Sequence, residues 1–235
     1  MVNKWLQSAR SCLYPPTCAM CGCASDTQLD LCTECHDALP HNSSACSQCA
    51  LPLDGTSDKT LCGQCLNSTH SFDNTFSLFQ YSNPVDHFIQ SLKFNGKLRF
   101  ANLLGNLLAD ALSDRPPESL PELIIPVPLH SSRQRERGFN QAVEIARPVS
   151  RALNIPLNYS GCIRSRPTIA QSTLNKSERR SNIRGAFAVK RKINIKNVAI
   201  LDDVITTGQT VNELARTLKQ HGVQNIEAWS IARAE

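Results

Sequence analysis

The sequence predicts an α/β fold in which a mostly parallel sheet with flanking helices follows a small zinc-binding domain. Across residues 72–231, short apolar segments typical of buried strands alternate with amphipathic segments typical of helices. Residues 1–70 instead contain four Cys-x-x-Cys pairs, a spacing typical of zinc knuckles. We therefore expect two domains: residues 1–70, an N-terminal helix plus a double zinc ribbon, and residues 71–235, the sheet and its helices.

The four cysteine pairs supply eight thiolates, enough for two tetrahedral zinc sites. They are Cys18/Cys21, Cys32/Cys35, Cys46/Cys49 and Cys62/Cys65. The simplest assignment places the first two pairs in one site and the last two in the other. An interleaved pairing stays open, and a disulfide scaffold or a redox-active pair are alternatives. Because the N-terminus lacks the charged-then-apolar pattern of an export signal, we expect a reducing cytoplasmic environment, where disulfides are rare.

Composition and charge restrict the function classes. No apolar run approaches the roughly 20 residues that a membrane-spanning helix needs, so we expect no membrane insertion. Residues 131–192 contain 14 basic and three acidic residues, whereas residues 1–70 carry more acids than bases. The basic segment favours an anionic partner such as phosphate, pyrophosphate or nucleic acid, although dispersed surface charges would give the same composition.

Each element of the second domain follows from local patterning. Apolar and polar residues alternate over 72–81, which predicts a strand, and two helical patterns follow at 84–94 and 98–112. Residues 123–129 predict a strand interrupted by prolines, followed by a basic, glycine-containing loop and a helix that ends near Leu153. Further strands are expected at 186–189, 198–201 and 225–231, with a helix beginning near Val211.

The most informative motif follows the strand at 198–201. The adjacent carboxylates of Asp202 and Asp203 end it, and a Thr-Thr-Gly-x-Thr turn then leads into a helix. Backbone N–H groups and the positive end of a helix dipole favour a phosphate, while the carboxylates suit hydroxyl groups nearby. No Gly-Lys-Ser/Thr follows, which disfavours an ATP-hydrolysing Walker loop. The alternative is a strand end with two solvated acids before an ordinary turn.

This motif resembles the phosphoribosyl pyrophosphate (PRPP) motif of type I phosphoribosyltransferases. The resemblance implies a type I phosphoribosyltransferase-like mostly parallel sheet with flanking helices, preceded by the zinc-ribbon domain. It implies that Asp202 and Asp203 bind the ribose hydroxyls and steady positive charge at the anomeric carbon. The 5′-phosphate would be held by Thr206, Thr207, Gly208, Gln209 and Thr210.

The same resemblance implies a pyrophosphate site after the strand at 123–129. There Arg137 and Gly138 would contact pyrophosphate, and Mg²⁺ would bridge pyrophosphate and ribose oxygens. Residues 164–187 are polar and rich in arginine, and the functional interpretation is a mobile hood that excludes water from the reacting sugar. A solvated linker between strands is the alternative.

Nearly the whole chain resembles one subgroup, the ComF/GntX family of phosphoribosyltransferase-like proteins associated with natural competence. The resemblance rests on the cysteine pairs, Ser91-Leu92-Lys93-Phe94, Pro126-Val127-Pro128-Leu129, Arg137-Gly138-Phe139-Asn140-Gln141, Thr168 with Gln171, Arg179 with Asn182, and the acid pair. It implies a bacterial cytoplasmic protein linked to the uptake or use of single-stranded DNA. PRPP or a related phosphorylated ribose, single-stranded DNA and a competence helicase are the partners it suggests.

Two functions remain open from the sequence. One is a phosphoribosyltransferase whose acceptor is not specified, and the other is a non-catalytic accessory protein that senses a nucleotide or binds DNA or a helicase. The ribbon segment is acidic and almost without aromatic residues, which favours a protein partner there rather than DNA. Lys93, on an otherwise apolar helix face, either reaches the phosphate site or extends to solvent.

Overall fold

The structure is a computed structural model that describes residues 17–27, 29–53, 61–166 and 183–235. Its contacts divide the chain into two compact units, Met1–Pro40 and His41–Glu235. The predicted N-terminal helix lies outside the described residues, as do Thr168, Gln171, Arg179 and Asn182. Among the described residues, no helix has both the length and the apolar character needed to cross a bilayer.

The first unit is a small cysteine-containing module. A tight turn follows Cys18, whose amide donates to the carbonyl of Cys23 at 2.8 Å, and a helix, α2 (Thr33–Asp37), begins after Cys32. Asp26 fixes the start of this helix, because its carboxylate accepts hydrogen bonds from both the amide and the hydroxyl of Thr33. Few apolar side chains are buried here, so ligand bonds to a metal would supply much of the folding free energy.

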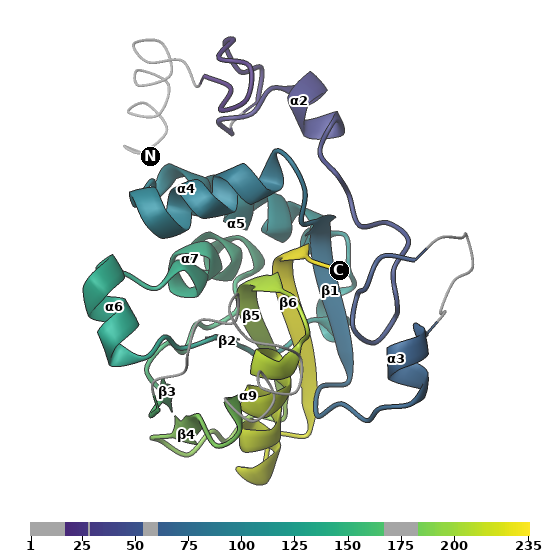
Figure 1. Cartoon of the computed structure of the whole chain (residues 1–235), viewed down its shortest axis with the longest axis vertical. Coiled ribbons are helices and arrows are strands. Elements are labelled where there is room, and N and C mark those ends of the chain that lie inside the picture. Colours follow the sequence, from purple (N-terminus) through teal and green to yellow (C-terminus); the bar gives the residue numbers. More distant parts are fainter. Residues whose placement is uncertain (1–16, 28, 54–60, 167–182) are drawn as a thin grey trace. The chain divides into compact units, whose positions relative to one another are not determined.

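The larger unit is built on a four-stranded parallel sheet with the strand order β1-β6-β5-β2 (Figure 1). The strands are β1 (Asn74–Gln80), β2 (Leu123–Pro126), β5 (Asn197–Ile205) and β6 (Asn225–Arg233). A separate antiparallel pair consists of β3 (Cys162–Arg164) and β4 (Phe187–Val189). The central strands β5 and β6 are buried along most of their length, as expected for parallel strands covered on both faces.

Helices cover the two faces of this sheet. On one face, α9 (Gln209–Gln220) packs its apolar stripe against β5 and contacts β4. On the other face lie α4 (Val85–Asn95), α5 (Arg99–Ser113) and α7 (Gln141–Leu153), with α5 packed on α7. The helix α6 (Ser131–Arg137) and the single-turn helices α3 (Gly63–Leu66) and η1 (Pro117–Ser119) complete the unit. The mostly parallel sheet with flanking helices is therefore confirmed.

The contact between α5 and α7 depends on Gly105. A Cβ atom placed there would lie 2.4 Å from Pro148 Cγ and 2.5 Å from the carbonyl oxygen of Ile145, closer than any atoms can approach without movement. The absent side chain lets the two helices pack closely and form a single layer beneath the sheet. This layer holds α4 and its Lys93 beside β5.

The second cysteine cluster belongs to the larger unit. The cluster consists of the buried residues Cys46, Cys49, Cys62 and Cys65. The partly buried Leu51 and Leu53 pack against it. The chain just before this cluster runs antiparallel beside β1, where His41 forms a bridge with Phe79 and the amide of Asn42 donates to the carbonyl of Leu78 at 3.0 Å. The expected boundary at residue 70 stays a prediction, while the contact division falls after Pro40.

One local prediction was wrong. The basic segment after β2, expected as a loop, forms the helix α6, whose N-cap His130 accepts a hydrogen bond from the amide of Ser132. The helix ends at Gly138, which adopts a left-handed conformation with φ of 83°. A histidine in place of the usual Ser, Thr, Asp or Asn at the cap concealed the start of this helix in the sequence.

Candidate functional site

The candidate site lies where the parallel strand β5 ends and α9 begins. Between them, Thr206, Thr207 and Gly208 form a short turn. Gly208 is the N-cap of α9 and has φ of 71°, a left-handed conformation that favours glycine. In this turn backbone N–H groups precede a helix of twelve residues, so the positive end of the helix dipole faces the same region.

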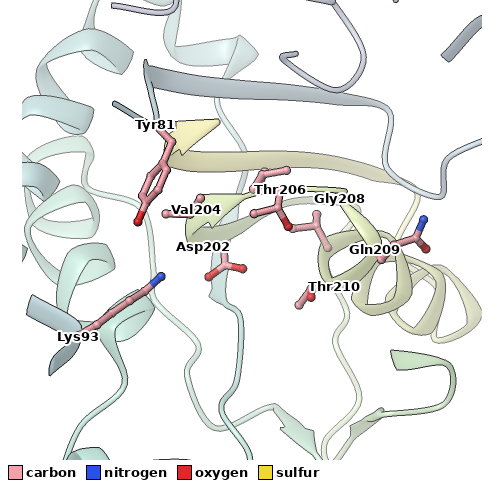
Figure 2. Close-up of a pocket in the computed structure, with 10 residues that line it drawn as sticks. Tyr81, Lys93, Asp202, Val204, Thr206, Gly208, Gln209 and Thr210 are labelled. Carbon is pink, nitrogen blue, oxygen red and sulfur yellow. The ribbon is translucent and has the colours of Figure 1, made fainter. Parts of the chain in front are cut away.

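A cavity of about 280 Å³ opens beside this turn. Its lining comes from four parts of the chain: Tyr81 after β1, Lys93 on α4, Asp202, Val204 and Ile205 on β5, and Thr206, Gly208, Gln209, Thr210 and Val211 at the turn and the start of α9. Figure 2 shows the ammonium of Lys93 pointing toward Asp202, with Tyr81 on the same side of Asp202 as Lys93 and the turn residues on the other. The site is therefore a polar hollow at the carboxyl edge of a parallel sheet, where such folds bind ligands.

The two acids of the motif lie on opposite faces of β5, because successive side chains of a strand alternate. Asp202 is partly exposed and lines the cavity, whereas Asp203 is 3% exposed and does not line it. Asp203 is instead paired with Lys93, whose Nζ lies 2.6 Å from Asp203 Oδ2. The sequence placed both acids at the end of the strand, but β5 continues past them to Ile205.

This arrangement changes the protonation of the site. Burial and the neighbouring Asp203 carboxylate raise the pKa of Asp202 well above its usual value, and Lys93 offsets only part of that effect. Burial lowers the pKa of Lys93, but the Asp203 carboxylate outweighs it, so that the pKa of Lys93 is raised and its ammonium stays charged. The result is one carboxyl group that holds its proton unusually well beside a fixed ion pair.

The turn itself has an unsatisfied hydroxyl. Thr207 Oγ1 is buried and makes no hydrogen bond among the described residues. A buried hydroxyl without a partner is costly, and in functional sites such groups are often paired when a ligand binds. Thr207 does not itself line the cavity, whereas its neighbours Thr206 and Gly208 do.

Arg137 and Gly138 end α6 and do not line this cavity. Arg137 lines a neighbouring hollow of about 170 Å³ that Lys93 also lines, so the two spaces share one cation. Its guanidinium lies 5.8 Å from the ring centroid of Phe94 and donates to Gln141 Oε1. Burial lowers the pKa of Arg137 while the Asp203 carboxylate acts in the opposite direction, which places this arginine within electrostatic reach of the acid pair.

The two cysteine clusters fit zinc. In each, all four sulfur atoms lie within 4.8 Å of one another, and the pairs combine in chain order: Cys18, Cys21, Cys32 and Cys35, then Cys46, Cys49, Cys62 and Cys65. Neighbouring sulfurs are 3.8 Å apart in the first and 3.6 Å in the second. Four ligands at about 2.3 Å in a tetrahedron give sulfur separations of about 3.8 Å. The sequential grouping is therefore the one the structure has.

Hydrogen bonds prepare the second cluster for a metal. Burial raises the pKa of the Cys46 thiol, but backbone N–H donors, the largest contribution coming from Cys62 at 3.3 Å, outweigh burial and lower the pKa to about 7. His70 lies against the same cluster, its Nε2 3.5 Å from Cys65 Sγ. The cluster is complete without it, so His70 supports the thiolates from outside.

Several residues of the site were not predicted. Tyr81 carried no signal beyond its place at the end of a predicted strand, and Lys93 was weighed against a solvent-exposed alternative. Arg164 on β3 was grouped with a long basic connection, yet it lies close enough to Asp202 for that carboxylate to affect its pKa, which burial lowers. All three come from strands or helices distant in the sequence, and only the sheet brings them to one edge.

Comparison with known proteins agrees with this architecture. Residues 9–66 match the model of the double zinc ribbon domain, and residues 140–234 match that of the phosphoribosyl transferase domain. The second match covers β5, the acid pair, the turn at Gly208 and α9, and it extends back to the start of α7.

Three curated relatives align with most of the chain. Competence protein F of Haemophilus influenzae is 38% identical over 74% of this chain and 78% of its own length. The DNA utilization protein YhgH of Escherichia coli K12 is 32% identical over 86% of this chain and 90% of its own length. Competence protein ComFC of Streptococcus pneumoniae is 27% identical over 67% of each chain. These relatives and both domain matches show that the chain belongs to the competence protein F/YhgH/ComFC family, with a double zinc ribbon and a phosphoribosyltransferase domain.

Proposed function

We propose that the cavity beside Gly208 binds PRPP, or a closely related phosphorylated ribose, together with Mg²⁺. One observation carries the proposal: Asp202, suited to ribose hydroxyls, and the turn residues Thr206 and Gly208, suited to phosphate, line the same hollow at the carboxyl edge of the sheet. The unpaired buried hydroxyl of Thr207 belongs to the same turn, although Thr207 does not itself line the hollow. A ligand with both groups about one sugar ring apart satisfies both sets of contacts.

Each residue has a distinct role in this proposal. The turn from Thr206 to Thr210 holds the 5′-phosphate through backbone N–H groups and the Thr207 hydroxyl. Asp202 accepts hydrogen bonds from the ribose hydroxyls and loses its extra proton when a cation arrives. Lys93 holds the carboxylate of Asp203 in place through the ion pair. Because Lys93 lines both hollows, its ammonium faces the pyrophosphate side of the ligand. Arg137 contacts pyrophosphate from the second hollow, and Gly138 lets α6 end close to it.

The reaction that this arrangement supports is pentosyl transfer. The bond between the anomeric carbon and pyrophosphate breaks, a bond from that carbon to an acceptor nucleophile forms, and pyrophosphate leaves. Bound Mg²⁺ would neutralise the leaving pyrophosphate. The fixed carboxylates stabilise positive charge that develops on the sugar when the bond loosens before attack. The acceptor is a separate question, since no side chain of the described cavity selects a particular nucleobase.

The names of the relatives suggest the setting of this activity. We propose that this protein acts in competence or in the use of incoming DNA, as competence protein F and the DNA utilization protein YhgH are named. A reducing, cytoplasmic setting suits eight thiolates that bind metal. The basic segment at 131–192 is the part of the chain suited to single-stranded DNA, and the acidic ribbon suits a protein such as a helicase.

A second candidate function is ligand sensing without transfer. The favouring observation is the Lys93–Asp203 ion pair, which engages one of the two acids with a cation of the cavity lining. A protein with this pair intact in the bound state would bind PRPP through Asp202 and the turn and would release no pyrophosphate.

Calorimetric titration with PRPP and Mg²⁺, followed by a scan of nucleobases for pyrophosphate release, separates these outcomes. Binding with release supports transfer, and binding without release for every acceptor supports sensing. Wild-type binding by Asp202→Asn would refute the assigned site. The matched control is Asp110→Asn, an exposed aspartate on α5 that does not line the cavity, and it should bind as wild type does.

A further inference from the structure

Arg233 connects the second cysteine cluster to the turn that forms the candidate phosphate site. It is the last residue of β6, and although charged it is only 6% exposed. Its Nε donates to the carbonyl of Cys49 at 2.9 Å, and its Nη1 donates to the carbonyl of Ile205 at 3.3 Å. Cys49 is a ligand of the cluster, and Ile205 is the last residue of β5 before the turn. One guanidinium therefore contacts both structures.

The backbone of Arg233 adds to this connection. It lies between Ile205 of β5 and Gln80 of β1 in the sheet register. Its carbonyl accepts the amide hydrogen of Tyr81 at 2.9 Å, and Tyr81 lines the same cavity as the turn. Arg233 therefore contacts two residues of the cavity lining, Ile205 and Tyr81, and the cysteine cluster outside the cavity.

A second, independent connection runs through the residues after the cluster. His70 lies next to Cys65 and stacks on Phe72, with ring centroids 4.8 Å apart. Phe72 is buried, and its Cζ would lie 3.9 Å from a Cβ atom placed on Gly208. Between these two rings, the amide of Ser71 donates to Asn212 Oδ1 at 2.7 Å, in the first turn of α9.

Both connections begin at residues of the second cluster. Metal bound by the Cys49 thiolate would restrain the Cys49 carbonyl that Arg233 contacts, and metal bound by Cys65 would restrain the segment from Cys65 to Phe72. A buried guanidinium that loses an acceptor must move or accept water, and the Ile205 carbonyl then loses one donor while it keeps the amide of Ala234 at 2.9 Å.

We propose that Arg233 is a positioning residue that couples the metal state of the second cysteine cluster to the geometry of the turn from Thr206 to Gly208. The metal of the second cluster orders the turn, and a phosphate ligand bound at the turn retains that metal, since coupling between two sites is reciprocal. The part that concerns a ligand rests on the proposed function, whereas the coupling between cluster and turn does not.

The test compares Arg233→Gln with Arg115→Gln in the zinc-loaded full chain. Arg115 also pairs with β6, through Glu227 at 2.7 Å, but near the opposite end of the strand. Hydrogen exchange of residues 204–212 should be about tenfold faster in Arg233→Gln and unchanged in Arg115→Gln. Equal exchange in the two variants overturns the proposal.

A second measurement leaves Arg233 unchanged, so its result does not depend on whether Arg233→Gln folds. In a Cys18→Ser background, which disables the first cluster, zinc release to a chromogenic chelator is followed with and without ribose 5-phosphate. Release should slow several-fold when the ligand is bound. Bound ligand with unchanged release contradicts the coupling. If ribose 5-phosphate does not bind at all, the proposed function fails, and the hydrogen-exchange result still decides the coupling.

Discussion

Lys93 Nζ and Asp203 Oδ2, from α4 and β5, lie 2.6 Å apart in a largely buried ion pair at the edge of the candidate site. The two residues are 110 positions apart in the sequence, and their contact joins the helical layer to the strand that carries the acid motif. Asp202 lines the cavity and Asp203 does not, but Lys93, the partner of Asp203, lines it as well. The ion pair therefore lies directly beside the cavity.

Replacing Lys93 by Met should destabilise the larger unit. The substitution leaves a carboxylate that is 3% exposed without its ion-pair partner, and breaking a buried pair costs about 3 kcal/mol. Urea unfolding of Lys93→Met, Asp203→Asn and the double variant measures the coupling. The double variant should recover most of the unfolding free energy that Lys93→Met loses. If Lys93→Met lowers the free energy of unfolding by the same amount in the wild type and in Asp203→Asn, the two side chains are not coupled.

The contribution of Asp202 to the free energy of unfolding should fall as the pH rises. Its raised pKa means that the folded protein keeps a proton that the unfolded chain has already lost. This contribution is fully present below the usual aspartate pKa near 4 and is lost as the pH rises toward the raised value. The charged groups facing it are Asp203, Lys93 and Arg164.

Unfolding experiments across the range from about pH 4 to 8 check this sign, with reference to the usual aspartate value. The free energy of unfolding of Asp202→Asn should decline less with rising pH than that of the wild type. Over the same window PRPP with Mg²⁺ should bind more tightly as the pH rises, because the ligand selects the ionised carboxylate. A wild type and Asp202→Asn with parallel stability profiles would contradict the raised pKa.

Thr207→Val should separate binding from stability. The variant removes a buried hydroxyl that has no partner among the described residues. The free energy of unfolding without ligand should therefore be unchanged or up to about 1 kcal/mol higher. Affinity for ribose 5-phosphate should fall about tenfold, equivalent to about 1.4 kcal/mol, because the hydroxyl loses its role with the phosphate. Calorimetry and urea unfolding provide the two measurements.

Thr75→Val is the matched control for Thr207→Val. Thr75 Oγ1, on β1, is likewise buried without a partner among the described residues, but Thr75 lies outside the turn from Thr206 to Thr210. Its substitution should affect stability in the same direction and leave ribose 5-phosphate binding as it is. A similar loss of affinity in both variants would mean that Thr207 acts through general packing.

Metal loss should affect the two clusters differently. The wild type should contain two zinc ions per chain, and Cys18→Ser and Cys46→Ser should each contain one. Because the second cluster lies in the same compact unit as the sheet, Cys46→Ser should lower the main thermal unfolding transition by several degrees. Cys18→Ser should leave that transition nearly unchanged. Equal shifts in both variants would contradict the division into units.

The sequence predicted the fold well where periodicity and turn chemistry act locally. The strand at 72–81, the helices at 84–94 and 98–112 and the acid-containing strand match β1, α4, α5 and β5 to within a few residues. Gly96 ends α4 in a left-handed conformation, as the Asn-Gly pair indicated. The four cysteine pairs also predicted the sequential grouping as the simplest assignment, with an interleaved grouping left open, and the structure has the sequential one.

The sequence could not reveal contacts made by tertiary structure. Nothing local indicated that Asp203 would pair with Lys93 while Asp202 lines the cavity, since alternation along a strand does not reveal which neighbours each face has. Tyr81 and Arg233 each follow or end a strand and gain their importance from neighbours that the sheet supplies. Roles in ligand binding for Asp202, Asp203 and the turn stay predictions that the experiments above address.

His41 and Asn42 cover one edge of the sheet, next to the second cysteine cluster. These residues occupy the outer edge of β1, where main-chain donors and acceptors would otherwise face solvent. Their position is tied to the second cluster through Asn42, which donates to the carbonyl of Ala50 at 2.9 Å. Chelators or thiol oxidation would thus uncover a strand able to join that of another copy, and self-association would be the first visible sign of lost zinc.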